Sequence, residues 1–176
     1  MRALLVLSLM MPGYAFAAGS DTMAPPKTTK TTKSCKGIKV YDASRKKCVN
    51  PKGSSLETDT LYQAARELAY AGRYDDAQGV LSAMPDQRDD RVLTYWGFTH
   101  RKMGQADLAQ AFYQQAIAQN PDNLLARSYM AQGFVEQGNR SAAMEQWREI
   151  KARGGEGSWP ETSLRQALLT GSTYQY

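Results

Sequence analysis

Histidine and cysteine are almost absent from this chain, which contains a single histidine, His100, and only two cysteines, Cys35 and Cys48. A zinc site needs four ligands, and His100 lies far along the chain from both cysteines, so we expect no metal and no cofactor. The chain also lacks the Gly-x-Ser-x-Gly, phosphate-loop and His-Glu-x-x-His motifs of common enzyme families. We therefore predict that the protein is not an enzyme.

Long apolar runs are absent as well. The apolar stretch 3–11 has nine residues, far fewer than the roughly 20 that a membrane-spanning helix needs. It follows the positive charge of Arg2 and is closed at 15–17 by a small-x-small pattern that signal peptidase cleaves. We predict that residues 1–17 are a cleaved signal peptide and that the mature protein is periplasmic, with secretion as an alternative. The competing interpretation of this segment is a membrane anchor.

The two cysteines predict a disulfide. In an exported protein an isolated pair of cysteines usually becomes oxidised, because the compartment itself is oxidising. A bond between Cys35 and Cys48 would close a loop of 14 residues and stabilise it by about 3 kcal/mol. Short strand-like segments at 38–41 and 48–49 flank a turn, so we expect a disulfide-closed hairpin over residues 35–53.

Acidic residues are rare near the N-terminus, where residues 18–53 carry nine Lys and Arg against two Asp, a net charge of +7. Residues 54–176 carry twelve basic and fifteen acidic residues, a net charge of −3. Within the basic region, residues 18–34 are rich in Lys, Thr and Pro and bury too little apolar surface to offset the loss of chain entropy. We predict that residues 18–34 are a disordered basic linker.

The basic region could bind a polyanion. Since an exported protein rarely meets nucleic acid, we expect no nucleic-acid partner and consider peptidoglycan or anionic lipid of the envelope instead. The pattern around Tyr41 resembles the end of small cysteine-rich modules, including the chitin-binding type, which implies contact with glycan. Two alternatives stay open: a solvated linker, or an arm that docks on the acidic repeat domain and is released by salt.

Small residues recur at a nearly constant interval in the rest of the chain. Gly72, Gly104 and Gly138 lie 32 and 34 residues apart. Each is followed five residues later by alanine and preceded seven residues earlier by alanine or glycine. A period in the low thirties, with small residues where two helices must touch, indicates a stacked array of helix hairpins.

Each of these glycines lies between two segments with helical periodicity. In the first pair, residues 58–71 and 74–84 place apolar and small residues on one face, and Pro85 ends the second helix. The second pair ends at Pro121 and the third at Gly154-Gly155. The glycine in each turn supplies the left-handed backbone conformation that ends a helix.

This pattern resembles the tetratricopeptide repeat family. The second repeat carries most of the family motif, in Trp96, Gly97, Gly104, Ala109, Tyr113, Ala116 and Pro121. The resemblance implies an all-α fold, a right-handed α-α superhelix of three helix hairpins at about 58–89, 90–123 and 124–156. The first repeat is two residues short, and the third has Arg127 where a large apolar residue is usual.

A capping helix follows the last repeat in this interpretation. Residues 160–170 have apolar residues on one side, Ser158 as a candidate N-cap and Gly171 as the closing glycine. Such a helix would shield the last hairpin and complete a repeat domain of residues 54–176.

The resemblance also implies a binding groove, because the first helix of each pair lines a concave face that holds extended peptides or a partner helix. Transferring that face to this sequence gives ten candidate partner-binding residues: Tyr62, Arg66, Tyr70, Arg91, Thr94, Phe98, Arg101, Lys102, Ser128 and Gln132. Arginine forks and tyrosine rings suit carboxylates and extended chain. Alternatively, Tyr62 and Tyr70 only cover the edge of the hairpin. The lysine and asparagine that bind chaperone tails in some relatives are replaced by Tyr62 and Arg66, which argues against that role.

We therefore expect an exported, non-enzymatic adaptor of the cell envelope that binds a protein or an extended peptide in the groove of its repeats. The alternative is an envelope-binding protein whose basic cysteine loop contacts peptidoglycan or anionic lipid, with the repeats acting as a spacer.

Overall fold

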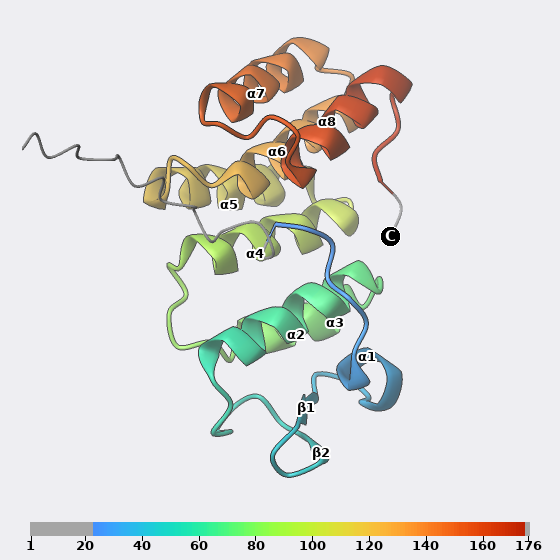
Figure 1. Cartoon of the computed structure of the whole chain (residues 1–176), viewed down its shortest axis with the longest axis vertical. Coiled ribbons are helices and arrows are strands. Elements are labelled where there is room, and N and C mark those ends of the chain that lie inside the picture. The colour runs from blue at the N-terminus through green and yellow to red at the C-terminus, as the bar shows by residue number, and fades with distance from the viewer. Residues whose placement is uncertain (1–22, 175–176) are drawn as a thin grey trace, which may run out of the picture.

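The computed structural model describes residues 23–174, so the predicted signal peptide and residues 18–22 of the predicted linker lie outside the described part. The described chain begins with a short helix and a two-stranded hairpin and continues as a series of longer helices (Figure 1). The N-terminal elements are α1 (Lys30–Ser34), β1 (Val40–Asp42) and β2 (Lys47–Val49). The helices that follow are α2 (Thr58–Tyr70), α3 (Tyr74–Leu81), α4 (Asp90–Lys102), α5 (Ala106–Gln119), α6 (Leu124–Glu136), α7 (Arg140–Ala152) and α8 (Trp159–Thr170).

The helices are stacked in pairs along the long axis of the molecule, as the repeat predicts (Figure 1). Helices α2 and α3, α4 and α5, and α6 and α7 form the three hairpins, and α8 packs against α6 and α7. The turn glycines Gly72, Gly104 and Gly138 have φ angles of 74°, 78° and 75°, a conformation that costs a residue with a side chain about 1–2 kcal/mol. The predicted helix-ending role of these glycines is confirmed.

Small residues lie where the paired helices approach one another. A Cβ atom added at Gly97 of α4 would lie 2.6 Å from the ring of Tyr113 on α5, so this contact requires glycine. Ala65, Ala77 and Ala143 are fully buried in the same way. The core therefore runs through the whole stack, because each hairpin buries one side against the next.

The last helix begins and ends where the sequence predicts. The Ser158 hydroxyl accepts a hydrogen bond from the Glu161 amide at the start of α8, Pro160 lies in the first turn, and Gly171 closes the helix with φ 71°. Leu164 and Leu168 of α8 pack with Ile150 in a second core cluster. Helix α8 thus covers the apolar side that the third hairpin would otherwise expose.

The disulfide hairpin is attached to the first repeat. Cys35 and Cys48 are bonded, as predicted, and β1 and β2 are antiparallel, with Tyr41 opposite Cys48. The Arg73 guanidinium, from the turn between α2 and α3, donates hydrogen bonds to the carbonyls of Cys35 and Gly37. The hairpin is therefore held to the first repeat by these hydrogen bonds and by Val40 of β1, which is buried in the core of the array.

Residues 23–34, which we define as the arm, differ from the predicted disordered linker. They form an ordered segment that contains α1 and extends along α2 toward α4 (Figure 1). The prediction of disorder counted apolar surface, whereas the arm docks through the hydroxyl and amide groups of Thr29 and Thr32, which bind the Glu67 carboxylate. Within residues 23–174, the structure contains no helix long and apolar enough to span a bilayer.

Candidate functional site

The predicted partner-binding residues lie on α2, α4 and α6, which are neighbours in the stack. We call the side of these helices that carries them the groove face. Of the ten residues, Arg91 and Lys102 are partly exposed and the other eight are buried. The groove face is therefore not an open channel along its length.

Aromatic side chains fill the middle of the groove face. Measured between ring centroids, Tyr70 and Phe98 stack at 5.4 Å and Tyr62 meets Tyr95 edge-on at 5.7 Å. The centroid of the Phe98 ring lies 4.9 Å from that of Tyr129. The hydroxyls of Tyr70 and Tyr129 share a hydrogen bond. Burial raises the pKa of Tyr62 and of Tyr95, so both phenols stay neutral. These rings belong to the core that joins the three repeats.

Two buried arginines lie beside this cluster. The Arg66 side chain donates to the Tyr95 hydroxyl, to Oε1 of Gln63 and to the carbonyl oxygen of Ala24 in the arm. The Arg101 guanidinium forms an ion pair with Glu136, with 2.6 Å between Nη1 and Oε1. Burial by itself disfavours both cations, but the phenol of Tyr95 raises the pKa of Arg66, and Tyr113 and Glu136 raise that of Arg101. Both arginines stay charged inside the fold.

Helix α8 covers the predicted partner-binding residues of the third repeat, Ser128 and Gln132. The Ser128 hydroxyl donates to the carbonyl of Pro160 at 2.7 Å, and the Gln132 side-chain amide lies within hydrogen-bond distance of Ser128 and Ser163. These contacts leave Ser128 and Gln132 at a helix–helix interface.

Lys102, the last residue of α4, is also engaged within the chain. Its ammonium group donates a hydrogen bond to the backbone carbonyl of Tyr174.

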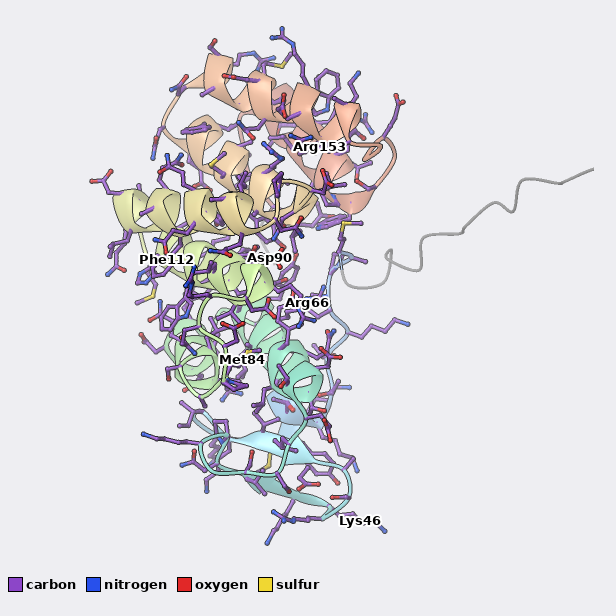
Figure 2. The ribbon with its side chains drawn as sticks, turned by 90° about the vertical axis from the view of Figure 1, so that its left-hand side faces the viewer. Lys46, Arg66, Met84, Asp90, Phe112 and Arg153 are labelled. Carbon is purple, nitrogen blue, oxygen red and sulfur yellow. A yellow bond between two sulfur atoms is a disulfide. The ribbon has the colours of Figure 1, made fainter. Side chains whose placement is uncertain are left out.

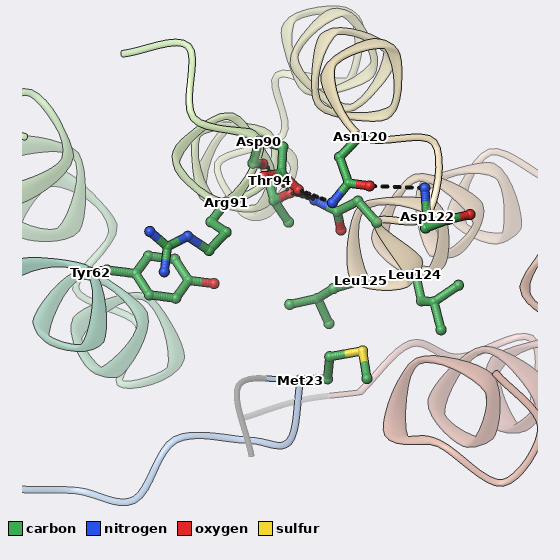
Figure 3. A pocket seen from close by; sticks show the side chains of 10 residues that line it. Met23, Tyr62, Asp90, Arg91, Thr94, Asn120, Asp122, Leu124 and Leu125 are labelled. Carbon is green, nitrogen blue, oxygen red and sulfur yellow. Dashed lines mark hydrogen bonds between the residues drawn. The ribbon is translucent and has the colours of Figure 1, made fainter. Parts of the chain in front are cut away.

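The open part of the groove face is a pocket of about 220 Å³ near the N-terminal ends of α4 and α6 (Figure 3). Three of the predicted residues, Tyr62, Arg91 and Thr94, line it. The other lining residues are Met23, Asp90, Asn120 and residues 122–125. The pocket thus combines predicted groove residues with the first described residue of the arm and with the loop before α6.

The charged groups of this pocket are held in fixed positions. Arg91 forms ion pairs with Asp89 and Asp59, and its guanidinium lies 4.9 Å from the centre of the Tyr62 ring. Although burial raises the pKa of Asp89, hydrogen bonds from Arg91 outweigh it and hold that pKa below its usual value. Hydrogen bonds from Asp89 and Asp59 in turn raise the pKa of Arg91.

Three residues of the site, Asp90, Asn120 and Asn123, are not among the residues predicted from the sequence. The side-chain amides of both asparagines donate to Oδ2 of Asp90, at 2.9 and 2.7 Å, and Asn123 also donates to the Thr94 hydroxyl (Figure 3). Asp90 is the first residue of α4, next to its N-cap, and Asn120 is the C-cap of α5. The spacing of the asparagines, three residues apart just before α6, is the signal that could have revealed this network.

Residues 100–156 match the sequence profile of the tetratricopeptide repeat family, from the last turn of α4 through α7. The match overlaps the second and third of the repeats that the glycine spacing predicts, and the stacked helix pairs of the structure are consistent with this family. Repeats of this family are in general scaffolds for protein–protein interaction. Neither the curated proteins nor the solved structures give a significant match to the chain.

Proposed function

We propose that this protein is a non-enzymatic adaptor of the bacterial cell envelope that binds an extended segment of a partner protein across the groove face. One observation carries the proposal: the groove face already holds an extended segment, namely the arm. Arg66 and Glu67 provide it with a donor and an acceptor, and the pocket around Arg91 continues the same surface beyond Met23. The Cys35–Cys48 disulfide is consistent with an oxidising compartment and supports the periplasmic location.

Arg91 is the residue with which to test the adaptor role, because it is partly exposed and lines the open pocket. Reversing the charge of Arg66 or Arg101 would instead leave a buried, unpaired carboxylate and would unfold the groove face. The matched control is Arg148→Glu, since Arg148 is exposed on α7 and away from the pocket.

We expect Arg91→Glu to lose a partner that crosslinks to the wild type and to Arg148→Glu in native envelopes. Circular dichroism and the melting temperature must show that both variants are folded. If all three proteins retain the partner equally, the groove face does not bind it and the proposal is wrong.

A second candidate function is attachment to an anionic envelope polymer through the hairpin. The observation that favours it is the row of exposed cationic side chains around the disulfide, with Lys46 at the far end of the molecule from Arg153 (Figure 2). Lys36→Glu combined with Lys47→Glu should reduce co-sedimentation with peptidoglycan or with anionic vesicles. Unchanged co-sedimentation relative to Arg148→Glu would reject this function.

A further inference from the structure

The carboxylate of Glu67 is buried, and within residues 23–174 its hydrogen bonds come from the arm. Glu67 is 4% exposed, and its side-chain oxygens accept four hydrogen bonds within the described residues. The donors are the backbone amides and the hydroxyls of Thr29 and Thr32, and the two hydroxyls lie 2.6 and 2.5 Å from the carboxylate. Without the arm, this carboxylate would be left on α2 without any of these donors.

The neighbouring cation has a weaker partner in the arm. Arg66 is 2% exposed, and it meets a backbone carbonyl, a phenol and an amide but forms no ion pair within residues 23–174. A carboxylate can accept two parallel hydrogen bonds from the planar arginine fork, which a single carbonyl oxygen cannot. The carbonyl of Ala24 is therefore not the strongest acceptor that this position could hold.

The arm itself is loosely packed. A space of about 390 Å³ is lined by Ala24, Pro25, Pro26 and Lys27 on one side and by Gln63 and Arg66 on the other. Pro25, Lys27 and Thr28 are exposed, and Met23, only half-buried, is the arm residue that packs on the second core cluster. Releasing the arm would thus exchange a few polar contacts for water and would uncover little apolar surface.

We propose that Arg66 and Glu67 form a peptide-binding site that the arm occupies as an internal competitor. The site takes a segment of a partner protein that is extended at its start and makes a helical turn at its end, with a carboxylate about five residues before two Ser or Thr hydroxyls that lie three residues apart. In the arm this turn is the start of α1, where Thr29 is the N-cap and Thr32 lies within the helix. The spacing follows the arm, where Ala24 meets Arg66 and Thr29 and Thr32 meet Glu67. The carboxylate follows from the missing ion pair of Arg66. This inference rests on the proposed function and specifies the partner of the same face.

The test uses the full chain and two fluorescent synthetic peptides. One peptide carries residues 21–34 of the chain, and the other carries the same residues with Ala24→Asp. Thr29→Val combined with Thr32→Val weakens the arm of the receptor without changing the site on α2. The matched control is Thr28→Val, because Thr28 is exposed and lies between the same contacts.

We expect the double variant to bind the unmodified peptide about tenfold more tightly than the wild type or Thr28→Val, since its own arm competes less. The Ala24→Asp peptide should bind about tenfold more tightly still. Glu67→Gln should abolish the gain of the double variant. Arg66→Lys should remove the advantage of the Ala24→Asp peptide, because lysine lacks the planar fork of arginine.

A folded double variant with no gain in peptide affinity would overturn the inference, and so would equal binding of the two peptides. Sedimentation tests for dimers. If the wild type forms a dimer and the double variant does not, the site binds the arm of a second copy instead of a partner protein. If these results are negative while Arg91→Glu still loses the envelope partner, the adaptor function stands and the peptide site on α2 does not.

Discussion

Helix α8 and the arm both cover the groove face, one over α6 and the other over α2, and they do so with opposite chemistry. Helix α8 buries Leu164 and Leu168 against the third repeat and places a regular helix over it. The arm has no regular secondary structure before α1, and its hydrogen bonds to α2 centre on Arg66 and Glu67. One cover resembles the core of the array, whereas the other resembles a bound peptide.

The difference in chemistry implies that detaching α8 from the groove face costs more free energy than detaching the arm. Exposing apolar surface costs about 25 cal/mol per Å², which water does not compensate. A hydrogen bond, by contrast, is replaced by one to water, so its net contribution is only about 0.5–1.5 kcal/mol, or 1.5–3 kcal/mol when one partner is charged. We therefore expect α8 to unfold together with the repeats and the arm to open before them.

The largest expected effect concerns the apolar cover. Leu164→Ala should lower the free energy of unfolding by about 3 kcal/mol, because Leu164 is fully buried and the change leaves a cavity. Leu169→Ala on the same helix is the matched control, since Leu169 is 70% exposed and should change stability by less than about 0.5 kcal/mol. Urea denaturation measures both. Equal losses would mean that α8 is not part of the cooperative core.

The next effect concerns the hairpin from which the arm extends. Cys35→Ser combined with Cys48→Ser should lower the local stability of the hairpin by about 3 kcal/mol. Hydrogen exchange should accelerate in residues 31–49 and stay unchanged in α4 to α8, because the hairpin contacts the array only at its first repeat. Reduction of the wild type with a thiol provides an independent control. Global unfolding on reduction would contradict the separation of the two regions.

The polar cover should respond only locally. Thr29→Val combined with Thr32→Val should lower the stability of the docked arm by about 3 kcal/mol, because two hydroxyl bonds to a carboxylate are lost at about 1.5 kcal/mol each. Hydrogen exchange of residues 24–34 should then accelerate while α8 keeps its protection. Salt should have little effect on the wild-type arm, since Lys27, Lys30 and Lys33 form no ion pair with the repeats in the described residues. Release of the arm by salt would contradict this expectation and would support the hypothesis, drawn from the sequence, that the arm docks by charge.

The smallest effect concerns a charge within the array itself. Asp89 is the N-cap of α4 and pairs with Arg91, and its pKa lies below the usual value. Because the folded pKa is lowered, the stabilisation is present at neutral pH and is lost as the pH falls below about 4. Asp89→Asn keeps a capping oxygen but removes the charge, so it should cost about 0.5 kcal/mol at pH 7 and nothing at pH 2. Thermal unfolding of both proteins across this pH range measures the difference, and a gap that persists at pH 2 would contradict it.

Local features of the sequence were enough to predict the stacked hairpins. Gly72 and Gly104 mark turns that need a positive φ, and Gly97 marks a close contact between paired helices. Ser158 and Gly171 mark the two ends of α8. These features depend on neighbouring residues or on one repeat of the period, which is why they can be seen in the sequence.

The state of the groove face could not be predicted in the same way. Tyr70 meets Tyr129, and Thr29 meets Glu67, across 59 and 38 residues of chain. Nothing in the local pattern around Glu67 distinguishes it from an exposed acid of a surface helix, and the composition of the arm indicates disorder. Composition alone misses the fact that a polar segment can be ordered by a buried carboxylate that accepts its hydrogen bonds.

The sequence by itself determined the repeats, their turns, the cysteine pair and the division of charge, because each arises from residue types at short or periodic spacing. Only the tertiary structure decided which of the groove residues stay partly exposed and which are covered. That outcome depends on how the stack curves and on which segments return across it, and long-range packing of this kind leaves no periodic trace in the chain.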